Sequence, residues 1–551
     1  MRAEPATLSA PVPKRQLTID ASCLAAITAV SALSYLPHLG FYSDDWNNLA
    51  RFTSEPHLSL GSVLAESASR PVQGAYFALL FKLFGLNPLG YHLVNTAVLS
   101  ASIGLLYLLL ARLRFGRVQA FAAGLIFAML PQLSTIRVWS AASQVTLSLA
   151  LMLVSTHWQL SFARSGKLKW LAGAVAAAIL SIGAYEIFAP LIAGFALGLI
   201  AARSRRLEIR DGRVAVAGVL VVALILLALL YKIVLSDRAG HVADPSRYLL
   251  GLRQLFRLDY DWRVDSGLNI VATPTAYFLA PIRGWWTGAR ALFTGQAPLE
   301  VVVIAILIAA VAWWRLAGAT QGADSRPPQR LLLAGIVVFL LGNATFLIVP
   351  AVVFTSTGID NRVQVAGAIG VAIMFASLLS LAVRAIPEQR RGVIFSTLIV
   401  ALTASAYVRL SSIEAYWAEA PAVQERVFAA ARSDLSAVPA NSTIILDGVC
   451  PYFGPAVVLE TSWDVGGALT LALGRPLKGD AVSPRMSPAA SGLRTSFYKE
   501  PSFYPYGPML FIYNPVKHQL TRVTDVETAV GYFRARRSAA CPGFVARGME
   551  V

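Results

Sequence analysis

Residues 89–112 have the sequence LGYHLVNTAVLSASIGLLYLLLAR, which is an apolar run that ends in a basic residue. In a helix that rises 1.5 Å per residue, a run of about 20 apolar residues crosses the ~30 Å hydrocarbon core of a bilayer. Runs of similar length recur along the chain, which is 56% hydrophobic and only 14% charged over 551 residues. This composition is too apolar for a soluble protein of this size. The sequence therefore predicts a mainly α-helical, polytopic membrane protein.

The apolar runs predict about eleven membrane-spanning helices. The expected spans are residues 21–41, 89–111, 118–134, 141–160, 169–184, 187–202, 214–235, 298–317, 331–354, 364–383 and 392–409. The first run is interpreted as an uncleaved helix, because Tyr35, Pro37 and His38 do not resemble the small-residue cleavage site of a signal peptide.

Basic residues gather in alternate short loops, and this asymmetry predicts the orientation in the membrane. Clusters of Arg and Lys lie within 112–117, 164–169, 203–213, 315–330 and 384–391. Short loops rich in these residues stay in the cytoplasm. The frequent Ala, Leu and Arg residues indicate a bacterial chain. We therefore expect a multi-pass protein of the bacterial cytoplasmic membrane, with its N-terminus in the cytoplasm and its C-terminus in the periplasm.

This orientation divides the chain into three expected parts. Residues 1–20 are a cytoplasmic tail, 21–409 a transmembrane module and 410–551 a periplasmic C-terminal domain. Within the module, the longer segments 42–88 and 236–297 are expected to be outer loops. The first of them includes the stretch 75–84, which is predicted to form an amphipathic helix lying flat in the membrane interface.

The C-terminal region alternates β-type runs with turn-rich stretches, so a small α/β domain is expected there. Residues 443–446 and 509–513 are the clearest of these runs. Cys450 and Cys541 also lie in this region, and an oxidising periplasm would allow the two thiols to form a disulfide.

Several classes of function are disfavoured by what the sequence contains. The formal charge of +17 does not indicate nucleic-acid binding, because the basic residues recur at the ends of apolar runs rather than in one stripe or arm. The sequence has no Walker loop and no Gly-x-Gly-x-x-Gly after a strand. It also has no His or Cys cluster typical of a metal site. We therefore expect no nucleic acid, no metal ion and no other cofactor.

Two adjacent carboxylates follow the first predicted span, in Ser43-Asp44-Asp45-Trp46. A carboxylate at a low-dielectric interface has a raised pKa unless its anion is stabilised, so it can act as a general base toward a hydroxyl. The alternative interpretation is a hydrated loop with a Trp in the aromatic belt of the membrane. The sequence does not decide whether Asp44 or Asp45 is the base, and we prefer Asp44.

The order of motifs after these acids resembles the first outer loop of the GT-C superfamily of membrane glycosyltransferases. The motifs are Asp44-Asp45-Trp46, Arg70-Pro71, the stretch 75–84, Gly85-x-x-x-x-Gly90-Tyr91-His92-x-x-Asn95 and a long apolar helix ending in Arg112. Within the superfamily they are most similar to protein O-mannosyltransferases and lipid A aminoarabinose transferases. The resemblance continues through Val138-Trp139-Ser140 and Gly183-Ala184-Tyr185-Glu186, and covers most of residues 20–235.

This resemblance implies a GT-C fold and an inverting transfer of a sugar from a polyprenyl-phosphate donor to an acceptor hydroxyl on a lipid, a polysaccharide or a protein. By analogy, Asp44 or Asp45 would be the catalytic base. The departing lipid phosphate also requires fixed cations. The candidates for binding substrate or lipid phosphate are Arg70, His92, Arg137, Glu186, Arg362 and one of Arg238, Arg247, Arg253 or Arg257.

Each of these assignments has an alternative interpretation in which the residue does not bind a substrate. An isolated Arg at a membrane surface often reaches lipid phosphate without binding a substrate, and His92 can simply pack beneath the loop. At the level of the whole protein, the main alternative is a transporter or flippase for lipids or glycolipids. A noncatalytic assembly protein with a glycan-binding C-terminal domain is the third possibility.

Overall fold

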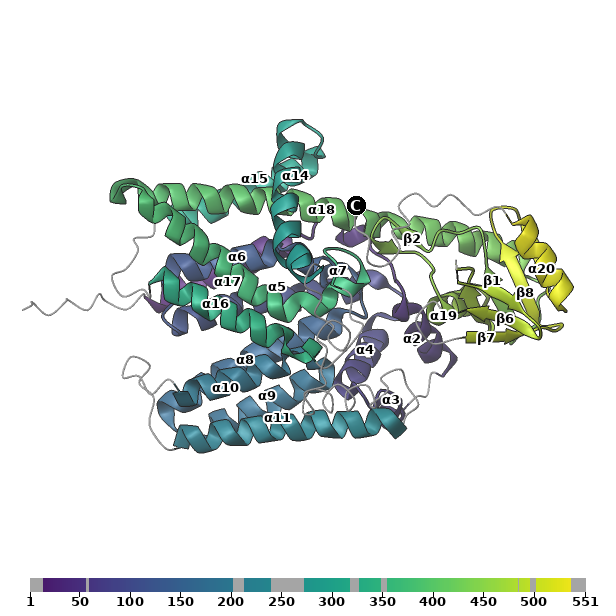
Figure 1. Cartoon of the computed structure of the whole chain (residues 1–551), viewed down its shortest axis with the longest axis horizontal. Coiled ribbons are helices and arrows are strands. Elements are labelled where there is room, and N and C mark those ends of the chain that lie inside the picture. The colour runs from purple at the N-terminus through teal and green to yellow at the C-terminus, as the bar shows by residue number, and fades with distance from the viewer. Residues whose placement is uncertain are drawn as a thin grey trace, which may run out of the picture.

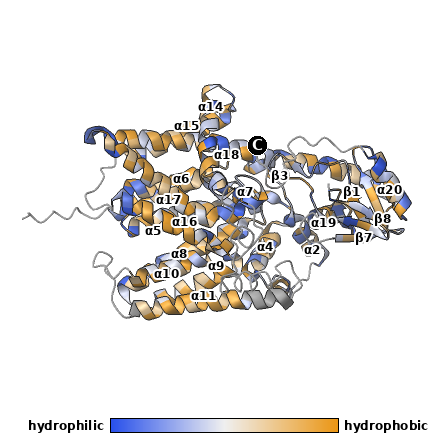
Figure 2. Ribbon diagram, viewed as in Figure 1, coloured by the Kyte–Doolittle hydropathy of each residue, from blue (hydrophilic) through white to orange (hydrophobic). Residues whose placement is uncertain are grey.

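The computed structural model describes residues 13–55, 59–201, 213–238, 272–317, 327–347, 354–483, 485–495 and 502–536. Long helices lie side by side in one body, and a smaller domain with β-strands lies at one end of it (Figure 1). Apolar residues predominate on the long helices, whereas the smaller domain mixes hydrophilic and hydrophobic residues (Figure 2). The predicted class, a mainly α polytopic membrane protein with a small C-terminal α/β domain, is confirmed.

The helices of the larger body follow the apolar runs. They are α1 (Lys14–Val30), α4 (Pro71–Phe84), α5 (Pro88–Arg112), α6 (Arg117–Met129), α7 (Ser134–Val138), α8 (Ser143–Ser165), α9 (Leu168–Ala184), α10 (Ala189–Ala201), α11 (Arg213–Arg238), α14 (Ala280–Phe293), α15 (Leu299–Ala317), α16 (Pro328–Asn343), α17 (Val365–Ala382) and α18 (Glu388–Asp434). Their ends follow local chemistry: Asn87 caps α5 by accepting the backbone N–H of Leu89, and Pro88 occupies the first turn, where no N–H is required.

Six of the described helices are long and apolar enough to cross a membrane, or seven if a bent pair is one span. They are α5, α8, α15, α16 with its 3₁₀ extension to Leu347, α17 within Ile359–Ala385, and α18; the bent pair is Arg117–Met129 with Pro131–Val138. Four further apolar helices are shorter, namely Pro71–Phe84, Leu168–Ala184, Glu186–Ala201 and Ala215–Tyr231. Each of the eleven predicted spans overlaps a helix, but among the described residues fewer than eleven helices have the length and composition of a full span.

Two predicted features differ from the structure. Helix α1 ends at Val30, and the chain continues through the 3₁₀ turn η1 (Leu36–His38), so the first run does not remain helical to residue 41. Pro37 in that turn cannot donate a backbone hydrogen bond to a continuing helix.

Helix α4 is apolar on its exposed side as well as its buried side, since Phe77 is buried while Leu83 is 62% exposed. The expected amphipathic character of residues 75–84 is therefore wrong.

Helix α18 continues past residue 409 to Asp434 and connects the two parts of the molecule (Figure 1). It includes Pro421, which has no N–H and so leaves the carbonyl of Trp417 without its usual partner in the helix. That carbonyl accepts the hydroxyl of Tyr42 instead. The proline therefore creates a docking point for the loop that leads to Asp44.

The C-terminal domain contains a four-stranded sheet of order β4-β1-β8-β9 and a three-stranded antiparallel sheet of order β5-β6-β7. Strand β1 is parallel to β4 and β8, and β9 is antiparallel to β8. The strands are β1 (Thr443–Leu446), β2 (Tyr452–Phe453), β3 (Ala456–Val457), β4 (Lys478–Ala481), β5 (Ser487–Ala489), β6 (Gly492–Thr495), β7 (Ser502–Pro505), β8 (Leu510–Asn514) and β9 (Gln519–Arg522). Helices α19 (Ser462–Leu473) and α20 (Val526–Ala535) complete the domain.

Candidate functional site

The two adjacent aspartates begin helix α2 (Asp44–Ser54), and the structure separates their roles. Asp45 is fully buried. One of its oxygens accepts the backbone N–H of Tyr42 at 3.0 Å, and the other accepts that of Ala141 at 2.7 Å. Burial raises the pKa of the Asp45 carboxyl well above its usual range, although these backbone donors oppose the rise. Asp45 therefore fastens the start of α2 to the turn that follows α7.

Asp44 has different surroundings, because the residue is less buried than Asp45 and its carboxylate interacts electrostatically with the guanidinium groups of Arg362 and Arg70. Burial raises the pKa of the Asp44 carboxyl, while Arg362 and then Arg70 act to lower it. The result is a carboxylate more basic than an ordinary Asp, with two cations to favour its ionised form. These are the properties of a general base.

Arg70 precedes α4 and is held by the turn that contains Glu186. Its Nη2 and Nε donate to the two carboxylate oxygens of Glu186 at 2.9 and 3.3 Å. Its guanidinium also lies over the ring of Tyr185, 4.4 Å from the centroid. A two-point ion pair combined with stacking holds a planar guanidinium in one orientation. The Tyr185-Glu186 turn therefore positions Arg70 beside Asp44.

Arg362 lies in the 3₁₀ segment η7 (Ile359–Gln364), just before α17. Its guanidinium lies over the ring of Trp139 at 5.0 Å, and Nη1 donates to the carbonyl of Ile359. Among the described residues, the buried Nε–H of Arg362 has no hydrogen-bond partner. This donor is therefore available for an anion bound beside Asp44.

The loop that carries Arg362 is tied to the break between α6 and α7. The amide of Asn361 donates to the carbonyl of Pro131 at 3.0 Å and to Ser134 Oγ at 2.7 Å. The hydroxyl of Thr135 donates to the carbonyl of Gly358. The bent helix pair thus supports Arg362, although the sequence around the break contains no residue of the site.

Four of the predicted residues therefore come together, and we refer to Asp44, Arg70, Glu186 and Arg362 as the Asp44 cluster. They come from α2, the start of α4, the turn after α9 and the segment before α17. One carboxylate flanked by two guanidinium groups can accept a proton from a hydroxyl and stabilise an anion next to it.

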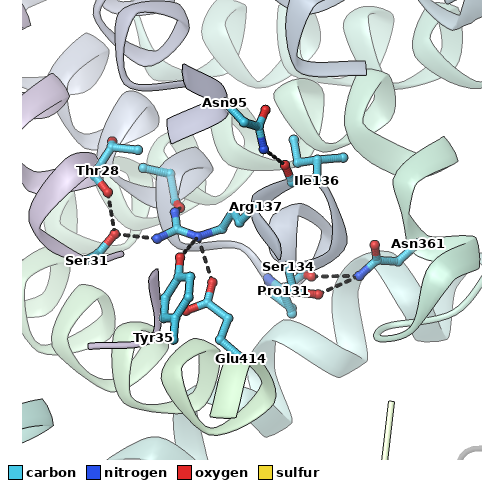
Figure 3. A network of polar contacts seen from close by, with 11 residues as sticks. Thr28, Ser31, Tyr35, Asn95, Pro131, Ser134, Ile136, Arg137, Asn361 and Glu414 are labelled. Carbon is cyan, nitrogen blue, oxygen red and sulfur yellow. Dashed lines mark hydrogen bonds and ion pairs between the residues drawn. The ribbon is translucent and has the colours of Figure 1, made fainter. Parts of the chain in front are cut away.

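Arg137 has partners in the protein interior, and none of its hydrogen bonds among the described residues goes to this cluster (Figure 3). It is 3% exposed, and its Nε donates to Glu414 at 2.7 Å and to the hydroxyl of Tyr35 at 3.0 Å. Its Nη2 donates to Ser31. The prediction that Arg137 binds lipid phosphate is therefore corrected. Its guanidinium instead joins α7 to α18 and to the end of α1 in the protein interior.

His92 is fully buried near the start of α5, and its Nε2–H donates to the carbonyl of Gly40 at 2.9 Å. Gly40 also packs against Pro421, since a Cβ at Gly40 would lie 2.7 Å from the proline ring. His92 therefore holds the loop before Asp44 against α5 and α18. This placement corresponds to the packing role, and no contact of His92 with the Asp44 cluster is seen among the described residues.

The C-terminal domain contributes groups next to Asp44 that sequence reasoning missed. Glu460 is buried, and its carboxylate accepts from the hydroxyls of Ser43, at 3.5 Å, and Tyr452. The indole N–H of Trp463 donates to Ser43 Oγ at 3.2 Å. The spacing Thr461-x-x-Asp464 is a capping box that predicts the start of α19, but nothing in it indicates contact with residue 43.

The same domain packs closely on the backbone of α2. A Cβ at Gly467 of α19 would lie 2.5 Å from the carbonyl oxygen of Trp46, so only glycine fits at this contact. The amide of Gln424 donates to the carbonyls of Phe41 at 3.1 Å and Val458 at 2.8 Å. Ser43 has φ +47°, a backbone conformation that L residues rarely adopt. The loop at 40–46 is therefore clamped between α18, α19 and α5.

Some predictions fall outside what the structure describes. Cys541, Arg247, Arg253 and Arg257 are not among the described residues, and neither is the side chain of Arg238. Cys23 is a free thiol, and the Cys450–Cys541 disulfide stays a prediction. Within the described ranges no group of three His, Cys, Asp or Glu residues could hold a metal ion, and the expectation of no metal also stays a prediction.

A cavity of 640 Å³ lies along α18 and the turn between α14 and α15, and no residue of the Asp44 cluster lines it. Its lining includes His38, Glu300, Glu419 and Arg426. The cavity and the candidate site are therefore separate features, and the chemistry of the site is argued from the cluster alone.

Comparison with known proteins gives matches in structure only. No protein-family model matches the chain, and no curated protein matches it in sequence. The arabinofuranosyltransferase AftD from mycobacteria resembles it with a TM-score of 0.41 and 16% sequence identity. That match covers 85% of this chain and 33% of AftD, so the chain spans a third of the length of that enzyme.

ArnT from Cupriavidus metallidurans resembles the chain in two states. The structure bound to undecaprenyl phosphate has a TM-score of 0.35 and 13% identity, over 83% of this chain and 85% of ArnT. The apo structure has a TM-score of 0.40 and 15% identity, over 83% and 84%.

Proposed function

We propose that this chain is an inverting glycosyltransferase that moves a sugar from a polyprenyl-phosphate donor to an acceptor hydroxyl. The reaction would take place at the side of the membrane that carries the C-terminal domain. The observation that supports this most is the arrangement of Asp44 beside Arg362 and Arg70. Such a transfer requires one base and fixed cations, because a proton leaves the acceptor while negative charge develops on a phosphate.

In the proposed reaction the acceptor O–H gives its proton to the carboxylate of Asp44. The acceptor oxygen then forms a bond to the anomeric carbon, from the face opposite the phosphate. The bond between that carbon and the phosphate oxygen breaks, and the electron pair leaves with the polyprenyl phosphate. Arg362 and Arg70 stabilise the charge on the departing phosphate, and attack from the opposite face inverts the configuration.

The position of the cluster supports a donor that is anchored in lipid. Arg362 immediately precedes α17, and the segment Ile359–Ala385 has the length and composition of a membrane span. Arg70 immediately precedes the apolar helix α4. A phosphate on a polyprenyl chain lies at the level where apolar helices end, so it would reach these cations without leaving the membrane surface.

Glu186 has a supporting role in this proposal. Its carboxylate is already engaged with Arg70 at 2.9 Å, so it fixes the cation rather than acting on the acceptor. A neutral residue at this position would leave the guanidinium free to turn away from the phosphate. Asp44 is therefore the residue of the cluster that we assign to proton transfer.

The test is transfer of radiolabelled sugar from synthetic polyprenyl-phosphate sugars by the purified protein in detergent, with lipid, polysaccharide and protein fractions as acceptors. We expect transfer by the wild type and its loss in Asp44→Asn. Arg51→Gln is the matched control, because Arg51 lies in the same helix and forms an exposed ion pair with Glu66 outside the cluster. Full activity in Asp44→Asn would show that Asp44 is not the catalytic base.

Binding of polyprenyl phosphate is measured in parallel and separates the alternatives. Tight binding without turnover for any donor and acceptor would favour the lipid transporter or flippase. Hydrolysis of the donor without transfer would instead indicate that the correct acceptor is missing from the mixture.

A further inference from the structure

Helix α14 has one face that packs on the neighbouring helix α18. At Gly288 a Cβ would lie 1.9 Å from the carbonyl oxygen of Ser405, and at Gly284 it would lie 3.2 Å from the side chain of Arg409. The two glycines are four residues apart and therefore lie on the same side of α14. Glycines at this spacing allow two helix backbones to approach closely. This face fixes α14 firmly to α18.

The opposite face of α14 is apolar and exposed. Ile282 is 48% exposed, Trp286 72% and Phe293 92%. At 100° per residue the three side chains fall within about 40° of one another around the helix. Arg283 and Arg290 are exposed and lie along one flank of this stripe. An apolar stripe with Trp and flanking Arg is typical of a helix at a membrane interface.

Both ends of this helix lie at the same level of the bundle. At the N-terminal end, the buried hydroxyl of Tyr277 donates to Asn343 Oδ1 at 2.9 Å, at the last residue of α16, and approaches the carbonyl of Gln364, just before α17, at 3.2 Å. At the C-terminal end a short turn leads to Leu299, the first residue of α15. All three neighbours have the composition of membrane spans.

Helix α14 therefore crosses the spans instead of running along them, and it protrudes from the side of the bundle (Figure 1). A helix that joins the ends of several spans at one level lies parallel to the membrane surface. Exposed apolar residues continue along the chain into α15, where Leu299 is 80% exposed and Ile306 61%. Because α15 has the length and composition of a membrane span, we expect lipid to cover Ile306.

We infer that α14 lies in the lipid interface on the side of the membrane that carries the C-terminal domain. Ile282, Trp286 and Phe293 enter the acyl region, and Arg283 and Arg290 reach the lipid phosphates. The partner of this face is the bilayer itself, because the stripe is apolar, followed along the chain by a span and flanked by cations that match lipid phosphate. Through its glycine face α14 then holds α18 at a set height.

The experiment uses the full chain with Cys23→Ser, labelled with a nitroxide at one introduced cysteine and reconstituted in vesicles of phosphatidylethanolamine and phosphatidylglycerol. Trp286→Cys and Phe293→Cys probe the apolar stripe. Thr287→Cys and Thr294→Cys are matched controls on the polar side of the same helix. Collision rates with oxygen, which concentrates in lipid, and with a nickel chelate, which stays in water, are measured at each site.

Labels at 286 and 293 are expected to collide at least threefold more with oxygen relative to nickel than labels at 287 and 294. Equal nickel access at all four sites would place α14 in water and overturn the inference. Dipolar broadening between copies at 286 would show that a second copy covers the stripe, and would also overturn it. None of these measurements needs turnover, so failure of the proposed transferase reaction would leave the result intact.

Discussion

Asp44 and Asp45 are adjacent in the chain, yet only the carboxylate of Asp44 interacts with arginines, while both oxygens of Asp45 accept backbone N–H groups. The difference follows from the start of α2, where consecutive side chains are about 100° apart around the helix axis. The side chain of Asp45 is directed to the turn after α7, and that of Asp44 is directed to the arginines of the cluster. The pair thus divides into an anchor and a candidate base.

Exchanging each aspartate for asparagine separates these roles. Asp44→Asn is expected to lower transfer by about 10²–10⁴-fold, the usual contribution of a general base, with little change in thermal stability. Asp45→Asn directs an amide N–H at a backbone N–H and is expected to destabilise the fold by about 1–3 kcal/mol. Transfer rates measure the loss of activity, and thermal unfolding in detergent measures the loss of stability. Equal loss of stability in the two variants would contradict the division.

The pH dependence of transfer follows from the pKa of Asp44. A base is active when deprotonated, so the rate is expected to fall as the pH drops through its pKa, which burial places above the ordinary aspartate value. Arg362 lowers this pKa, so Arg362→Gln should move the acid limb to higher pH as well as lower the maximum rate. The profile of kcat/KM against pH checks this, and an acid limb that stays in place would exclude the coupling.

Arg70 is expected to act mainly on the lipid phosphate. Arg70→Ala should raise KM for the donor about tenfold or more, the scale of a charged hydrogen bond of roughly 1.5–3 kcal/mol. Arg70→Lys should restore little of the lost donor affinity, because an ammonium cannot make the two-point contact with Glu186 while stacking on Tyr185. Initial rates over a range of donor concentrations measure KM, with Arg51→Gln as the control. A KM unchanged in Arg70→Ala would argue against phosphate binding.

The buried pair of Arg137 and Glu414 should matter for stability rather than for chemistry. The two side chains are 2% and 0% exposed, so removing one partner leaves an uncompensated charge in the interior. Glu414→Leu is expected to cost about 3–5 kcal/mol, and the double variant Arg137→Met/Glu414→Leu should recover much of that loss. Thermal unfolding of the four proteins in detergent provides the test. A double variant no more stable than Glu414→Leu would show that other groups account for the loss.

Contact with the C-terminal domain should influence the site through Ser43. Glu460→Gln and Trp463→Phe are expected to reduce transfer several-fold, because Ser43 loses partners that hold the start of α2. Hydrogen exchange of a peptide spanning 39–49 should increase in both variants. Asp447→Asn is the control, since this buried carboxylate of the same domain bonds to Tyr532 and Arg536 instead. Unchanged hydrogen exchange in both variants would show that contacts with the C-terminal domain do not stabilise the start of α2.

Much of the architecture could be predicted because hydropathy is a property of contiguous residues. The run at 89–112 becomes α5 almost residue for residue, and every other predicted span overlaps a helix. Helix ends were less predictable, as α1 stops at Val30 and α18 continues through Pro421. For α18 a distant partner contributes, since the carbonyl released by Pro421 accepts the hydroxyl of Tyr42.

The candidate site was predicted only as a set of residue types on one side of the membrane. Isolated charges in outer turns are costly without a role, so Asp44, Arg70, Glu186 and Arg362 could be selected from the sequence. The same reasoning selected Arg137, which the structure pairs with Glu414. A charge that binds a substrate and a charge that binds a buried partner have the same local signature, and their partners are remote in the chain.

By itself the sequence determined the membrane class, the helical runs, the small α/β domain and the carboxylates and arginines available for chemistry, because each depends on neighbouring residues. Only the tertiary structure decided that Asp44 rather than Asp45 meets the arginines, and that Glu460 touches Ser43 from 417 residues away. These pairings depend on how α2, α18 and α19 pack together. Packing joins residues whose separation in sequence carries no information about their contact.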